Sequence, residues 1–162
     1  MGGNHLTPLL GDESKRIDTL RAHSKEIVLS ATSGEKTIYE SGDVFSRIGK
    51  GFNHPEVNQA GKPTLEMKIR IIDAKGGLTY RIKGEPKKHC LTQHQMIELC
   101  RNNKEELAGN LRSNICIFEG PADVFHICKV CLSGEEMIVE HMSFKTHPLI
   151  TSGYYRLFTA QQ

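Results

Sequence analysis

Residues 64–83, TLEMKIRIIDAKGGLTYRIK, form the most regular stretch of the chain and decide its fold class. Apolar residues alternate with charged ones before the Gly76-Gly77 pair, and the alternation resumes after it with Leu78, Tyr80 and Ile82. Because side chains on a strand point to opposite faces with a period of two, this pattern predicts a β-hairpin with one apolar face. The other face carries four cations and one carboxylate: Lys68, Arg70, Arg81, Lys83 and Glu66.

The register of this hairpin would set like charges against each other. A turn centred on Lys75-Gly76 places Ile71 opposite Tyr80. The same register places Arg70 opposite Arg81, an arrangement that costs stability. Such an uncompensated arrangement indicates a binding partner, and we expect that partner to be anionic. The alternative is a solvated sheet face whose Lys and Arg side chains extend into water.

Two flanking segments add lysines to this predicted basic patch. Residues 49–63, GKGFNHPEVNQAGKP, read as a long loop, and residues 84–90, GEPKKHC, as a polar connector. The Gly-Lys pairs of the loop lack the spacing of a phosphate-binding loop, so we expect no nucleotide site there. The predicted binding residues are Lys68, Arg70, Arg81, Lys83, Lys50, Lys62, Lys87 and Lys88.

Length and composition limit the class of protein. The 162 residues suit one domain with a buried core. A net charge of +2 is too small for a protein that binds nucleic acid over its whole surface. The apolar runs fall far short of the ~20 residues of a membrane-spanning helix, and the first residues do not resemble a signal peptide. Five cysteines, an odd number, favour a reducing compartment. We therefore expect a cytoplasmic or nuclear location.

The N-terminal part predicts an arm, a helix and a hairpin. Residues 1–12 read as a flexible N-terminal arm, and residues 13–24 as a short helix with Ile17 and Leu20 facing inward. Residues 26–31 are strand-like and would pair with residues 36–40 across a Ser33-Gly34 turn.

The second half of the chain predicts one main helix and several strands. Thr92 and Gln95 form a capping-box pattern, and the apolar stripe that follows extends toward Leu111 as one bent helix or two short ones. Residues 115–118, ICIF, read as a buried central strand. Residues 124–132 would pair with 137–145, and residues 153–160 would add a last strand.

These elements together predict an α+β fold. We expect a mostly antiparallel sheet of hairpins, with one main helix packed over it and a short N-terminal helix. Residues 13–162 would form a single α+β domain.

Four residues are candidate zinc ligands: His126, Cys128, Cys131 and His141. His126, Cys128 and His141 could share one face of a hairpin, with Cys128 nearly opposite His141. Cys128 and Cys131 are three residues apart and would point to opposite faces of a regular strand, which leaves a tetrahedral site without its fourth ligand. We therefore expect no metal and no cofactor. A zinc-binding regulatory or RNA-binding domain that uses these four residues is the alternative.

No arrangement of residues predicts catalysis. His89 and Cys90 are sequence neighbours, which seldom present both side chains to one substrate. The nucleophile elbow, the H-E-x-x-H helix and the dinucleotide fingerprint are all missing from the sequence. We expect a protein that is not an enzyme and has no catalytic residues.

Residues 65–132 resemble the core of rhabdovirus-type matrix proteins. The similarity lies in the order and spacing of LEMKIRI, TYRIK, the capped helix that begins near Thr92, and ICIF. The N-terminal segment departs from that family, since it has neither a proline-rich late-budding motif nor a lysine cluster.

The resemblance implies a non-enzymatic, viral matrix-like assembly protein. Such a protein self-associates as a homo-oligomer, coats a nucleoprotein or RNA core and contacts an anionic membrane surface. It would be found in the host cytoplasm or nucleus, in peripheral association with a membrane, and in the virion.

Overall fold

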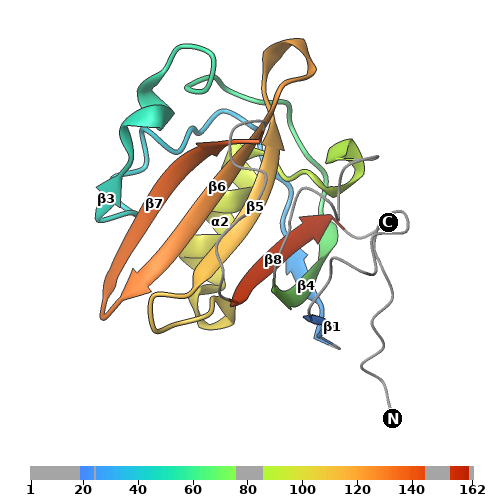
Figure 1. Cartoon of the computed structure of the whole chain (residues 1–162). Helices are drawn as coiled ribbons and strands as arrows, with labels where there is room; N and C mark the ends of the chain where they lie inside the picture. The colour runs from blue at the N-terminus through green and yellow to red at the C-terminus, as the bar shows by residue number, and fades with distance from the viewer. Residues whose placement is uncertain (1–18, 24, 76–85, 145–153, 161–162) are drawn as a thin grey trace.

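The computed structural model describes residues 19–23, 25–75, 86–144 and 154–160 (Figure 1). Within these ranges the chain forms a mixed sheet with strand order β1-β4-β8-β5-β6-β7-β3, and β2 also pairs with β4. The β5–β8 and β3–β7 pairs are parallel and the other pairs are antiparallel. The predicted α+β fold with a mostly antiparallel sheet is confirmed. The strands are β1 (Thr19–Ala22), β2 (Ile27–Leu29), β3 (Arg47–Ile48), β4 (Met67–Lys75), β5 (Ser113–Glu119), β6 (Phe125–Ser133), β7 (Glu136–Ser143) and β8 (Tyr154–Ala160).

In the described part of the chain, the α-helix α2 (Gln93–Asn102) covers one face of this sheet, and short 3-10 turns lie in the connecting segments. Figure 1 shows α2 lying behind β5 and β6. Met96 and Ile97 of the helix pack in one buried cluster with Ile69 and Ile71 of β4, so the helix covers the predicted apolar face. The 3-10 turns are η2 (Lys50–Asn53), η3 (Pro86–His89), η4 (Lys104–Glu106) and η5 (Pro121–Asp123).

The capping box at the start of α2 is present as predicted. The Thr92 hydroxyl accepts the backbone N–H of Gln95 at 3.1 Å, and the Gln95 side chain accepts the backbone N–H of Thr92 at 2.9 Å. The predicted extension to Leu111 is wrong, because the helix ends at Asn102 and Leu111 is 63% exposed with a φ of 61°. Asn residues compete with the helical backbone through local hydrogen bonds, which explains why the helix stops there.

The register predicted for β4 is wrong. Ile71 pairs with Phe158 of β8 on one side, and on the other side its carbonyl accepts the N–H of His23 at 2.9 Å. Both edges of β4 are therefore occupied at Ile71, where Tyr80 was expected. Residues 76–85, which include Arg81 and Lys83, lie outside the described ranges. Alternation along a strand predicts its two faces but carries no information on which strand pairs with it.

The predicted cationic face extends over only half of β4. Lys68 and Arg70 are exposed, as expected. Ile72 and Ala74 share their face of the strand and are buried against Leu157 in a second cluster, on the sheet face opposite α2. The sheet is therefore buried on both faces at its centre. This agrees with the prediction that the continuous apolar run ICIF, now part of β5, forms a buried central strand.

Two predictions for the N-terminal part are wrong. Thr19–Ala22 is strand β1 rather than the end of a helix, because it pairs with the edge of β4. Strand β2 is confirmed, but residues 36–40 form no strand and end in a turn, and Thr32 bridges to Thr64 instead. Tertiary pairing overrides a weak local propensity in both places. Residues 1–18, which include the predicted arm, and Ser24 lie outside the described ranges.

Three other strand predictions are confirmed. Strand β5 contains the ICIF segment, β6 pairs with β7 as an antiparallel hairpin, and β8 forms the last described strand. The hairpin turns at Gly134, whose φ of 63° suits a residue without a Cβ.

Candidate functional site

The exposed half of β4 carries two cations with few acidic partners. The Lys68 ammonium lies 3.4 Å from a carboxylate oxygen of Glu26, and both side chains are about half exposed or more. The Arg70 side chain is exposed and has no hydrogen bond or ion pair with the residues that the structure describes. Val28 lies directly opposite Lys68 in the β2–β4 register and is 51% exposed. We call Val28, Lys68 and Arg70 the β4 basic face.

The other predicted binding residues that the structure describes lie in different surroundings from this face. Lys50 follows β3, at the opposite end of the strand order, and the four strands between β4 and β3 separate it from Arg70 by about 24 Å along the sheet. Lys62 and Lys87 line a cavity near the first turn of α2, and Lys88 is the exposed neighbour of Lys87 in η3. The predicted single patch is therefore divided into separate regions.

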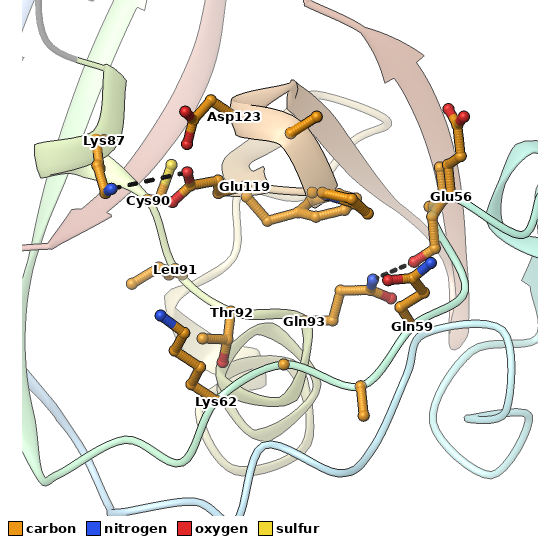
Figure 2. A pocket seen from close by; sticks show the side chains of 17 residues that line it. Glu56, Gln59, Lys62, Lys87, Cys90, Leu91, Thr92, Gln93, Glu119 and Asp123 are labelled. Carbon is orange, nitrogen blue, oxygen red and sulfur yellow. Dashed lines mark hydrogen bonds and ion pairs between the residues drawn. The ribbon is translucent and has the colours of Figure 1, made fainter.

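The cavity encloses about 570 Å³ and is formed by three segments far apart in the sequence (Figure 2). These are residues 56–62 of the long loop, residues 87–93 of η3 and the start of α2, and residues 118–123 at the end of β5. Val57, Leu91 and Phe118 are buried and give it an apolar floor. Its volume lies in the ~300–1,000 Å³ range of small-molecule sites.

Buried polar side chains of α2 hold the loop beside the cavity. Gln93 donates its amide N–H to the Val57 carbonyl at 2.6 Å and accepts the backbone N–H of Ile38 at 3.0 Å. The Nδ1 atom of His94 accepts the backbone N–H of Gly34 at 3.0 Å. A Cβ at Gly34 would lie 2.3 Å from the Lys62 carbonyl, so only glycine fits this close approach. The predicted loop is thus anchored at several points.

Charged side chains of both signs surround the cavity. The Lys87 ammonium lies 3.9 Å from a Glu119 carboxylate oxygen. Glu56, Lys62 and Asp123 are exposed and, among the described residues, have no side-chain ion pair.

The cysteine thiols are not activated. Burial raises the pKa of Cys90 to about 12, with Glu119 adding to the increase and Lys87 opposing it. The Cys90 thiol donates to the Pro86 carbonyl at 3.3 Å. Burial also raises the pKa of the four remaining thiols, those of Cys100, Cys116, Cys128 and Cys131. A protonated thiol is a poor nucleophile, so none of these side chains has the lowered pKa that a cysteine enzyme requires.

Two of the candidate zinc ligands form a histidine pair. Nδ1 of His126 lies 2.9 Å from Nε2 of His141, and the His126 ring stacks on Phe118 with a centroid distance of 5.2 Å. Burial lowers the pKa of His126. Cys128 is opposite His141 in the β6–β7 register, as expected, whereas Cys131 points to the other face. Within the described ranges, no group of three or more His, Cys, Asp or Glu residues could hold a metal ion. The zinc-binding alternative stays a prediction.

None of the helices in the described ranges is long and apolar enough to cross a membrane. Comparisons of the chain with protein-family models, with curated proteins and with solved structures found no match. Its function is therefore inferred from its own side chains.

Proposed function

We propose that this chain is a non-enzymatic binding and assembly protein that attaches to an anionic membrane surface through the β4 basic face. The observation that carries this proposal is the exposed guanidinium of Arg70, which has no acidic partner among the described residues and lies beside exposed Lys68.

The ion pair at Lys68 does not prevent such binding. Exposed pairs contribute about 0–1 kcal/mol, so Lys68 can exchange Glu26 for an external anion at little cost. Each basic residue near an anionic membrane contributes about 1 kcal/mol. Lys68 and Arg70 together would give a weak attachment that decreases as salt rises.

Exposed apolar side chains favour a membrane over nucleic acid as the partner. Val28 is 51% exposed opposite Lys68, and Leu65, just before β4, is 84% exposed. An apolar group beside a cation, as Val28 is beside Lys68, suits the boundary between lipid headgroups and acyl chains. No described aromatic residue belongs to the β4 basic face, so base stacking on RNA has no support there.

The matrix-like role implied by residues 65–132 belongs to the same proposal. Self-association would multiply a weak contact, because many copies on one surface bind with higher avidity than one. A nucleoprotein or RNA core would be the second partner, as the resemblance implies. Sedimentation of the purified chain over a range of concentrations tests the self-association.

Vesicle flotation tests the proposal directly. The wild-type chain should float with phosphatidylserine-containing vesicles, and not with phosphatidylcholine vesicles. Arg70→Glu should weaken this binding by about 2 kcal/mol, or roughly thirtyfold, because it removes one attraction and adds one repulsion.

Lys50→Glu is the matched control, because it makes the same change of charge at the opposite edge of the sheet. It should change binding little, and circular dichroism should show both variants folded. Equal loss of binding in the two variants would contradict the proposal. Binding to single-stranded RNA that depends on Arg70, without vesicle binding, would replace the membrane with RNA as the partner.

A further inference from the structure

The cavity beside α2 has two sides of opposite charge. Figure 2 shows Glu119 and Asp123 on one side, and Lys62 beside Thr92 on the other. Thr92 is the N-cap of α2, and the positive end of the helix dipole adds to the side that holds Lys62. The acidic side comes from the end of β5 and from η5.

The charges on these two sides differ in their availability. Glu119 is partly neutralised by Lys87, whose ammonium lies 3.9 Å away. Asp123 and Lys62 have no side-chain partner among the described residues, so one anion and one cation remain available. Glu56 belongs to the loop and lies apart from both sides in Figure 2.

An apolar floor connects the two charged sides. Leu91 and Phe118 are 1% and 2% exposed, and Phe118 is held between His126 and Phe52 by ring stacking. A cavity of about 570 Å³ is larger than a single ion needs, and its apolar floor suits an occupant that has an apolar body as well as charges.

The turn that carries Asp123 has an unusual backbone. Ala122 and Asp123 both have positive φ, 58° and 57°. This conformation is unfavourable for alanine, although Asp tolerates it better than most residues. Backbone strain of this kind often occurs at binding sites, and here it positions the carboxylate of Asp123 at the cavity.

We infer that this cavity is a binding site for a free amino acid with a large apolar side chain, independent of the β4 basic face. The ligand ammonium would contact Asp123 and Glu119, and its carboxylate would contact Lys62 at the first turn of α2. The apolar side chain would lie on Leu91 and Phe118. One end of a long polypeptide carries only one of these two charges and would therefore make only part of these contacts.

Three matched ligands test the two charged sides separately in calorimetric titrations of the full chain. L-phenylalanine carries both charges, phenethylamine lacks the carboxylate, and 3-phenylpropionate lacks the ammonium. We expect L-phenylalanine to bind most tightly and each analogue to bind roughly fivefold more weakly, since each lacks one exposed ion pair. The absence of L-phenylalanine binding would overturn the inference, as would equal affinity for all three matched ligands.

Two variants assign the charges to residues. Asp123→Asn should weaken binding of L-phenylalanine and phenethylamine but not of 3-phenylpropionate, and asparagine tolerates the positive φ of this position. Lys62→Met should weaken L-phenylalanine and 3-phenylpropionate but not phenethylamine. The reverse pattern, or equal effects on all three ligands, would refute the assignment.

Glu135→Gln is the control, because Glu135 is exposed in the β6–β7 turn and does not line the cavity. It should bind L-phenylalanine like the wild type. Arg70→Glu should also leave this binding unchanged, which separates a failure of the amino-acid site from a failure of the membrane proposal.

Discussion

The two halves of β4 use charged residues in different ways. In the first half, Lys68 and Arg70 are exposed, and their one ion pair among the described residues is the exposed pair of Lys68 with Glu26. In the second half, Asp73 is partly buried, on the opposite face of the strand from Ile72 and Ala74, and has two side-chain partners. Its carboxylate accepts two N–H groups of Arg156 at 2.8 and 3.1 Å and lies 2.7 Å from Nε2 of His23.

This difference separates charges that stabilise the fold from charges available to a partner. Arg156 also donates to the Glu106 carbonyl at 2.9 Å, so the Asp73 network joins β4, β8 and η4. Arg70 makes no such contact with the described residues. A charged side chain that is already paired within the fold must give up that pair before it can bind a ligand. An exposed and unpaired charged side chain can bind a ligand at low cost.

The largest expected effect concerns the buried core of the second half. Ile72→Ala should lower the free energy of unfolding by about 2–5 kcal/mol, because Ile72 is 1% exposed and its removal leaves a cavity. Urea denaturation measures this loss. Leu65→Ala, which removes a side chain that is 84% exposed, should stay within about 0.5 kcal/mol of the wild type. A small effect at Ile72 would show that this face of β4 is not buried.

A smaller loss of stability is expected for the Asp73 network. Asp73→Asn should cost about 1.5–3 kcal/mol, because hydrogen bonds to a charged group are lost and the Arg156 guanidinium keeps no carboxylate partner there. The same urea denaturation with Arg70→Gln should show a change below about 0.5 kcal/mol. Equal costs at Asp73 and Arg70 would remove the contrast between the two halves.

The same network predicts how stability depends on pH. Burial raises the pKa of the Asp73 carboxyl, but the hydrogen bonds from Arg156 and His23 outweigh it and leave the pKa below its ordinary value of 3.8. The stability that Asp73 contributes is therefore fully present above about pH 4 and is lost as the pH falls through the lowered pKa. Wild-type unfolding free energy should drop more steeply below pH 4 than that of Asp73→Asn. Parallel curves for the two proteins would show that the Asp73 carboxyl is not stabilised by its partners.

Elements with strong local signals could be predicted from the sequence. The Thr92–Gln95 capping box locates the start of α2, and the ICIF run locates β5, because both signals involve residues that are close in the chain. The β6–β7 hairpin follows for the same reason. Its register, with Cys128 opposite His141, could also have indicated that His126 reaches His141, since diagonal neighbours on one face lie within reach.

Long-range partners could not be predicted in this way. Asp73 and Arg156 are separated by 83 positions, and nothing in the segment around either residue specifies the other. The strands that pair with β4, and the cavity, could not be predicted for the same reason. The cavity, for example, is lined by three segments that are far apart in the sequence. Lys62 and Lys87 were predicted to bind an anionic surface, but their joint place at this cavity follows only from the tertiary fold.

The most direct test of the β4 basic face is the affinity of two single variants for phosphatidylserine-containing vesicles. Glu26→Gln removes the carboxylate that competes for Lys68, so binding should become up to about fivefold tighter. Arg70→Gln removes a cation, so binding should become roughly fivefold weaker. Opposite changes of this kind cannot arise from a general loss of folding. Unchanged binding in both variants, or weaker binding in both, would contradict the claim that unpaired cations of β4 hold the chain on an anionic membrane.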